Sequence, residues 1–183
     1  DAFWFSYDPT INDFTCAYSI GGSGYNDGTS IVWDNSSGNA YLAGNFLNNI
    51  NIGSQSYSSN GQTDCYIAKV GCCELPDGFL NGKSHGDNGF DAITDICIDD
   101  AGNIFATGQF STSIVFYNPS GNVTLTGTPG GFDGFIAKFN SNYECLWATS
   151  FSSATNGSVV SPQGIILDNS GNIVVTGYYA GSM

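Results

Sequence analysis

The sequence predicts an all-β protein made of tandem antiparallel sheets, and three observations predict this class. Of the 16 acidic residues 14 are Asp, only 3 residues are Lys, none is Arg, and 25 are Gly. This composition favours turns over exposed helix faces, where Glu, Lys and Arg are the usual residues. The apolar runs, such as the one from Gly164 to Leu167, have strand length and end at Asp or Gly. Finally, two short motifs recur along the whole chain, which is typical of repeated structural units.

The first motif occurs three times and predicts a β-hairpin. It reads DNSSGNAYLAG from Asp34, DDAGNIFATG from Asp99 and DNSGNIVVTG from Asp168, each time after an apolar run. An Asp side chain caps its own turn, Gly supplies the positive φ of a tight turn, and the neighbouring Asn tolerates it. The turn residues of the repeat are therefore Asp34, Gly38, Asn39, Asp99, Gly102, Asn103, Asp168, Gly171 and Asn172.

The second motif alternates with the first and predicts a further strand. It reads DAFWFSY from Asp1, DCYIAKV from Asp64 and DGFIAKF from Asp133, and the copy at Asp1 is the weakest. Its copies begin 63 and 69 residues apart, and the hairpin motifs begin 65 and 69 residues apart. We therefore expect residues 1–183 to form a single β-repeat array. Its units are approximately 1–63, 64–132 and 133–183, and the last unit is incomplete.

Together the two motifs resemble the bacterial β-propeller repeat of the SBBP type, over essentially the whole chain. The likeness includes the Gly-Gly turn between Tyr18 and Gly24, and Trp147 before the next unit. The chain departs from the pattern in its longer units, in the loss of Gly-Gly before Asp99 and Asp168, and in Ser6 where the motif has Lys. The resemblance implies four-stranded antiparallel blades arranged around an axis.

Three such units are too few to close a ring, because closed propellers have about four to eight blades. Three arrangements remain open: a longer array of which this chain is a part, several chains that complete one another, or units that stack differently. The DAFWFSY motif is the strand that we expect after Gly177. Another copy of the chain could therefore supply the strand that the last unit lacks.

Composition also narrows the location and the partners. A net charge of −13 without any Arg argues against nucleic-acid binding and against anionic membrane surfaces. No apolar run approaches the roughly 18 residues of a transmembrane helix, so membrane insertion is not expected. The sequence has no initiating Met and no leader, so any signal peptide was removed or lies outside it, and a fragment is equally compatible. We expect a secreted or cell-surface protein.

The six cysteines are an even number, which is compatible with up to three disulfides in an oxidising compartment. Buried free thiols are the alternative. The candidates are Cys16, Cys65, Cys72, Cys73, Cys97 and Cys145. Three N-glycosylation sequons fall in predicted turns or loops, which can accommodate glycans, at Asn35, Asn122 and Asn156.

Catalysis is not expected from the sequence. The single His, His85, lies in the Gly-rich segment KSHGDNG, where a histidine is most often solvated. The chain has no G-x-S-x-G elbow, no Walker loop and no dinucleotide-binding glycine loop. We therefore interpret the protein as one without an active site.

A structural Ca²⁺ is the only cofactor that the sequence suggests. Hard cations bind six to eight oxygen ligands, and one segment is crowded with carboxylates. Its candidate ligands are Asp87, Asp91, Asp95, Asp99 and Asp100. The competing interpretation is that the Asp-x-x-Gly-Asn pattern serves only to form turns.

The aromatic segment Phe3-Trp4-Phe5 is a candidate interface. Consecutive strand residues point to opposite faces, so this strand is either buried on both sides or leaves aromatic rings for a partner. We expect a non-catalytic structural module that assembles with its own copies into a filament, sheath or surface layer by strand addition. The alternative is an adhesin-like fragment of a longer protein that binds a glycan or protein through its loops.

Overall fold

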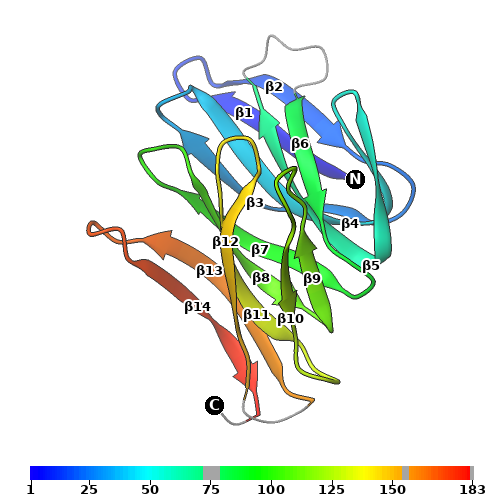
Figure 1. Cartoon of the computed structure of the whole chain (residues 1–183). Helices are drawn as coiled ribbons and strands as arrows, with labels where there is room; N and C mark the ends of the chain where they lie inside the picture. The colour runs from blue at the N-terminus through cyan, green and yellow to red at the C-terminus, as the bar shows by residue number, and fades with distance from the viewer. Residues whose placement is uncertain (72–78, 154–156, 182–183) are drawn as a thin grey trace.

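The computed structural model describes residues 1–71, 79–153 and 157–181, and confirms an all-β fold of antiparallel sheets. No helix in these residues is long and apolar enough to span a membrane. The described residues form fourteen strands (Figure 1): β1 (Ala2–Asp8), β2 (Asp13–Ile20), β3 (Asn26–Asp34), β4 (Asn39–Ile52), β5 (Gln55–Val70), β6 (Phe79–His85), β7 (Asp91–Ile98), β8 (Ile104–Phe110), β9 (Ser113–Phe116), β10 (Val123–Thr126), β11 (Asp133–Phe139), β12 (Cys145–Phe151), β13 (Val159–Leu167) and β14 (Ile173–Ala180).

Two four-stranded sheets with the same topology form the middle of the molecule. In sheet I the order is β3-β4-β5-β6, and in sheet II it is β7-β8-β11-β12. A two-stranded hairpin, β9–β10, lies between β8 and β11 in the sequence. Each sheet combines the apolar hairpin of one repeat unit with the second motif and the strand that follows it, so sheet boundaries are offset from unit boundaries.

The Asp-x-x-Gly-Asn motif forms the predicted hairpin turn in all three copies. Gly38, Gly102 and Gly171 adopt φ values of 67°, 80° and 79°, the left-handed region that favours glycine. In the third copy Asp168 accepts the main-chain N–H of Asn172 at 2.8 Å, and the side-chain amide of Asn172 binds the same carboxylate. In the second and third copies the Asn therefore closes the turn through its amide, a role beyond the backbone tolerance that the sequence predicts, whereas Asn39 of the first copy donates to the carbonyl of Ser37.

The layers stack face to face in the order hairpin β1–β2, sheet I, sheet II, hairpin β13–β14. One buried cluster lies between sheets I and II, with Tyr41 and Ile67 on one side and Phe135 and Phe139 on the other. A second cluster packs Trp4 of β1 against sheet I. Figure 1 shows hairpin β1–β2 at one end of this stack and hairpin β13–β14 at the other.

Side-chain hydrogen bonds also hold the layers together. The amide of Asn45 on β4 accepts the N–H of Ile93 at 2.8 Å and donates to the carbonyl of the same residue at 3.1 Å. Asp95 on β7 accepts the hydroxyl of Ser30 at 2.6 Å and the main-chain N–H of Ile165 at 2.8 Å. These contacts fix the stagger of successive layers as well as their separation.

The six cysteines are compatible with up to three disulfides, but three of them are free thiols in the structure. Cys65, Cys97 and Cys145 carry free thiols on three different strands. Cys65 and Cys145 fit the alternative of buried free thiols, because both are packed in the core between sheets I and II. Cys16 is not among the free thiols, and Cys72 and Cys73 lie outside the described residues.

Candidate assembly interface

The two terminal hairpins are halves of the four-stranded sheet that the chain builds twice. Hairpin β13–β14 carries the Asp-x-x-Gly-Asn turn and matches the first two strands of each sheet, β3–β4 and β7–β8. Hairpin β1–β2 carries the second motif and matches the last two strands, β5–β6 and β11–β12. Among the described residues, β1 pairs only with β2, and β14 pairs only with β13. The edges of β1 and β14 whose equivalents are paired in the complete sheets are therefore open.

Strand β1 exposes aromatic side chains at positions that are buried in the complete sheets. Phe3 is 69% exposed, whereas Tyr66 and Phe135, which occupy the same place in the second motif, are fully buried. Phe5 follows the same rule and is half exposed. Trp4, by contrast, points into the core against sheet I. The candidate interface Phe3-Trp4-Phe5 thus divides into one buried ring and two exposed ones, and the strand is not buried on both sides.

Strands β14 and β3 show the same difference. Tyr179 on β14 is 51% exposed, whereas its equivalent in sheet II, Phe110, is fully buried. On β3, Ile31 is 52% exposed, although its equivalents Ile96 and Ile165 are each 2% exposed because they pack on a preceding layer. The exposed residues at the two ends of the stack are therefore core positions that lack a neighbouring strand or a neighbouring layer.

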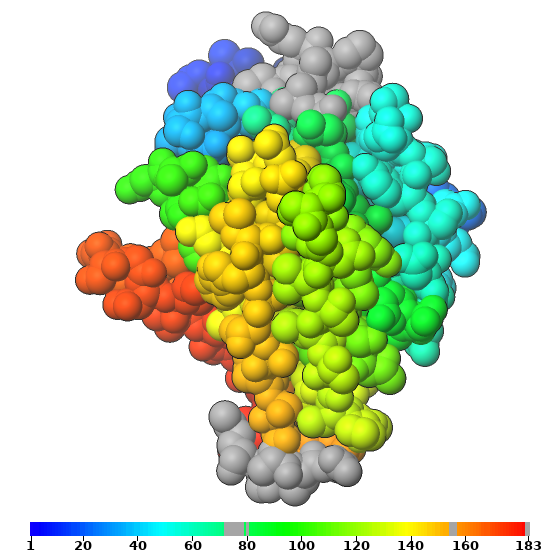
Figure 2. All heavy atoms as spheres, in the orientation of Figure 1, coloured from blue at the N-terminus to red at the C-terminus, as the bar shows by residue number. Residues whose placement is uncertain are grey.

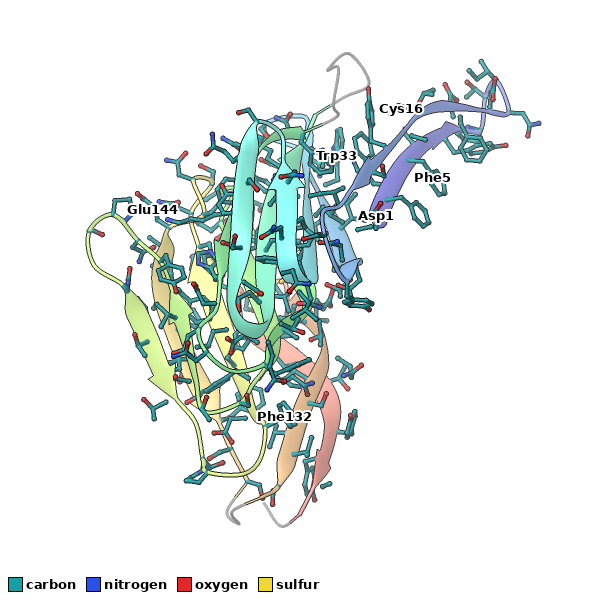
Figure 3. All side chains as sticks on the ribbon, turned by 90° about the vertical axis from the view of Figure 1, so that its right-hand side faces the viewer. Asp1, Phe5, Cys16, Trp33, Phe132 and Glu144 are labelled. Atoms are coloured by element: carbon teal, nitrogen blue, oxygen red, sulfur yellow. The ribbon has the colours of Figure 1, made fainter. Side chains whose placement is uncertain are left out.

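Hollows accompany both open edges. Beside β1 a groove of about 310 Å³ runs over β3 and β4, lined by Phe3, Phe5, Ile31 and Leu42 among others. A second hollow of about 210 Å³ continues it toward Trp33. Figure 3 shows the hairpin β1–β2 projecting beside sheet I, with Phe5 on the hairpin and Trp33 near its base.

At the opposite end a hollow of about 220 Å³ lies along β14. It is lined by Phe151 of sheet II, by Val160 to Pro162 of β13 and by Val175 to Tyr179 of β14. Figure 2 shows the C-terminal hairpin, coloured orange to red, standing out from the side of sheet II. Neither β13 nor β14 contains a charged residue. This surface is therefore suited to an apolar strand.

The five candidate calcium ligands perform separate tasks. Asp95 ties layers together, and Asp99 accepts hydrogen bonds from Asn103 within a hairpin turn and contacts Lys138 at 3.3 Å. Asp100 is exposed beside that turn. Within residues 1–71, 79–153 and 157–181, no three His, Cys, Asp or Glu side chains converge as a metal site.

Two of the carboxylates in this region are buried together. Asp91 accepts the main-chain N–H of Asp87 at 2.8 Å, while its other oxygen is buried without a hydrogen-bond partner. Burial, together with the nearby charges of Asp64 and Asp87, raises the pKa of Asp91 to about 8. Burial likewise raises the pKa of Asp64 to about 6. Sequence reasoning missed Asp64 here because it is distant along the chain.

His85 is fully buried, which corrects the expectation of a solvated loop residue. It ends β6, opposite Cys65, and its ring packs against Phe116 and Phe139. Its Nδ1 accepts the main-chain N–H of Tyr117 at 3.1 Å. Burial lowers the pKa of His85 to about 3, so the ring is neutral.

The sequons are placed as the sequence predicts where the structure describes them. Asn35 lies exposed in the β3–β4 turn, and Asn122 lies exposed in the β9–β10 turn. Asn156 lies outside the described residues. Neither described asparagine is on β1, β3 or β14, so a glycan at either leaves the backbone edges free.

Sequence reasoning named Phe3, Trp4 and Phe5 but missed the other half of the surface, on β3 and β14. Ile31, Trp33, Tyr178 and Tyr179 resemble ordinary core residues of apolar strands. The available signal was the repeat itself, because Ile31 and Tyr179 align with Ile96 and Phe110, which are core positions of sheet II.

Comparisons with known proteins do not add to these observations. A scan against protein-family models finds no model that matches the chain, and a search of the curated proteins finds no similar one. The likeness to the SBBP-type repeat therefore stays a prediction from the two motifs.

Proposed function

We propose that this chain is a non-catalytic structural subunit that assembles head to tail with its own copies, forming a filament, sheath or layer at the cell surface or outside the cell. One observation carries the proposal. Positions of the repeat that are fully buried in sheets I and II, such as Phe135 and Phe110, are exposed in the terminal hairpins as Phe3 and Tyr179. Contiguous exposed apolar surface of this kind favours association.

The two terminal hairpins are complementary halves of one four-stranded sheet. One end offers the first two strands of a sheet, β13–β14, and the other offers the last two, β1–β2. Pairing β14 of one copy with β1 of the next makes a four-stranded sheet with the topology of sheets I and II. Main-chain hydrogen bonds along an added strand supply affinity, as in other cases of strand addition.

The position of the two edges favours an open polymer. They lie at opposite ends of the stack (Figure 1), so a contact between unlike ends leaves one free edge on each side of a dimer. Heterologous contacts of this kind close into a ring only if the rotation per subunit allows it, and otherwise they propagate. An acidic surface, with a net charge of −13, opposes lateral clumping of such polymers.

Negative-stain electron microscopy of the purified chain, combined with its mass in solution, tests this function. We expect long uniform polymers whose proportion rises with protein concentration. Phe3→Asp, which places a charge on the open edge, is expected to leave a folded monomer and abolish the polymers. Ile11→Asp is the matched control, because Ile11 is similarly exposed but lies in the turn between β1 and β2.

A wild-type chain that stays monomeric at high concentration would contradict the proposal. The search would then move to an adhesin-like role, with glycan or protein ligands at the loops. Polymers that persist unchanged in Phe3→Asp would also contradict it, since assembly would then use another surface.

A further inference from the structure

We infer the register of the joint: β1 of one copy pairs antiparallel with β14 of the next so that Phe3 lies opposite Gly177, with its ring in the hollow along β14. This inference rests on the proposed function and specifies the partner surface, which is a second copy of this chain. It follows from the two sheets that the chain completes by itself, from a glycine that faces an aromatic ring, and from the hollows at both ends.

The register is the same in both complete sheets. In sheet I, Tyr66 of the second motif lies opposite Gly44, and in sheet II, Phe135 lies opposite Gly108. These glycines are the equivalents of Gly177, and the two aromatic residues are the equivalents of Phe3. Applying the register to the joint gives a series of opposed pairs that includes Phe3 with Gly177, Phe5 with Val175, Ser6 with Val174 and Tyr7 with Ile173.

The glycine in this register makes room for the ring. A Cβ atom built on Gly44 would lie 2.7 Å from Cε1 of Tyr66, so the ring lies directly against the glycine. The Tyr66 hydroxyl also donates to the carbonyl of Asp27 at 2.8 Å. Gly177 offers the same bare backbone at the open edge of β14, and a side chain there would meet the carbonyl of Ser161.

The hollow beside Gly177 has the right place and size for this ring. It holds about 220 Å³ and is lined by apolar groups that include Phe151 and Pro162. Phe151 belongs to sheet II, so the hollow faces the preceding layer. Phe135, the equivalent of Phe3, also faces its preceding layer and packs in the cluster shared with sheet I. Phe3 of an incoming copy would therefore point into the hollow.

The same joint fills the groove at the other end. With β1 paired to β14 of the neighbour, the hairpin β13–β14 lies over β3 and β4, where the groove of about 310 Å³ is found. It covers Ile31, whose equivalents Ile96 and Ile165 are almost completely buried by a preceding layer. One docking event thus accounts for the groove over β3 and β4, for the hollow along β14 and for the exposed residues on three strands.

The joint places few charges along the ladder. Strand β14 has no charged residue, and Asp8 of β1 falls beyond the pair formed by Tyr7 and Ile173. Asp1 falls opposite Tyr179, as its equivalents Asp64 and Asp133 fall opposite Phe46 and Phe110 in the complete sheets, where both carboxylates are buried. A register shifted by one residue would instead turn Phe3 and Phe5 to the face of β14 away from the hollow, since side chains alternate along a strand. The apolar pattern therefore selects one register.

Disulfide cross-linking tests the register directly. One variant combines Phe5→Cys with Val175→Cys, and a second combines Ser6→Cys with Val174→Cys, each within one chain. Opposed pairs of two spacings alternate along an antiparallel ladder, so one of these variants samples the closer spacing. Both cysteines of each variant are expected on one face of the joint, within reach of a disulfide. After mild oxidation we expect a ladder of covalent multimers and loss of the monomer band on a non-reducing gel.

The matched control combines Phe5→Cys with Val174→Cys, whose side chains point to opposite faces in the inferred register. It is expected to polymerise but to stay monomeric on the gel, as is the oxidised wild-type chain. A ladder from this control, or none from either opposed pair while polymers are present, overturns the register and leaves the proposed function standing. Absence of polymers from the wild-type chain overturns the proposed function itself.

Discussion

Asp95 and Ile165 join two successive layers of the molecule, because the Asp95 carboxylate accepts the main-chain N–H of Ile165 at 2.8 Å. Its other oxygen accepts the hydroxyl of Ser30 at 2.6 Å. One side chain on β7 therefore connects β3 and β13, the first strands of the layers on either side of it. The equivalent repeat positions are Ser30 in sheet I and Gly164 in the C-terminal hairpin. Neither residue has a carboxylate, so only sheet II makes this double connection.

Asp95→Ala is expected to lower the free energy of unfolding by about 1.5–3 kcal/mol, the usual range for hydrogen bonds to a charged group. The main-chain N–H of Ile165 loses its acceptor in this variant while sheet pairing within each layer is unchanged. Urea denaturation followed by tryptophan fluorescence measures the loss. Asp100→Ala, at an exposed turn position, is the control and should change stability by less than about 0.5 kcal/mol. Equal effects of the two substitutions would show that the connection contributes nothing.

The buried carboxylates predict an unusual dependence of stability on pH. Burial raises the pKa of Asp91 to about 8 and of Asp64 to about 6, whereas both titrate near 3.8 when unfolded. The folded state therefore binds protons more tightly than the unfolded state, and stability falls as pH rises from about 4 to about 8. We expect a higher urea midpoint at pH 5 than at pH 8.

Asp91→Asn provides the control for this pH dependence. The amide retains an oxygen for the N–H of Asp87 but does not ionise, so the variant should be more stable than the wild type at pH 8. Below pH 4 the trend reverses for a different reason. Hydrogen bonds from Ser37 and Ser36 lower the pKa of Asp34 to about 2. The stability that its ionised carboxylate contributes is therefore lost as pH falls from about 4 to about 2. A midpoint that rises steadily from pH 5 to pH 8 would contradict the assignment.

Much of the fold is predictable from the sequence because the repeat marks its own strands and turns. The Asp-x-x-Gly-Asn copies give three hairpins, since few residues other than glycine adopt the positive φ of Gly102 and Gly171 at low cost. The offset between repeat units and sheets is not predictable in this way. The pairing partner of each strand depends on which strands pack around the second motif. That arrangement is set by the packing of successive layers and not by the motif itself.

The candidate interface is predictable only in part, for a related reason. Three consecutive aromatic residues in β1 must alternate between two faces, but the sequence does not say which face has a neighbour. Trp4 is buried against sheet I, while Phe3 and Phe5 lie on the face without a covering layer. The Gly-rich segment around His85 predicts a loop. The sequence does not reveal that His85 pairs with β5 and that its ring contacts Phe139.

The buried free thiol of Cys65 is expected to be protected from alkylating reagents in the folded protein. Burial raises the pKa of Cys65 well above its ordinary value, and Cys65 is fully enclosed in the core. Its thiol is therefore expected to resist iodoacetamide in the folded protein and to react fully in denaturant, since the thiolate is the reactive form. Mass spectrometry of tryptic or Asp-N peptides measures the modified fraction. Rapid modification of Cys65 under native conditions would contradict its placement between the sheets.

Phe3 and Phe135 occupy equivalent positions of the repeat, but Phe3 is exposed and Phe135 is buried. Truncating each ring in turn therefore distinguishes an effect on folding from an effect on assembly. Phe135→Ala removes a fully buried ring and is expected to lower the free energy of unfolding by about 3–5 kcal/mol. Phe3→Ala removes a ring that is 69% exposed, and should change the stability of the monomer by less than about 1 kcal/mol.

The two variants should rank in the opposite order for assembly. Phe3→Ala should fold like the wild type yet require a higher concentration to polymerise, because its ring no longer fills the hollow beside Gly177. Urea denaturation in dilute solution gives the first ranking, and light scattering against concentration gives the second. If Phe3→Ala destabilises the dilute monomer as much as Phe135→Ala does, the ring is already packed within its own chain and the open edge of β1 is not an assembly surface.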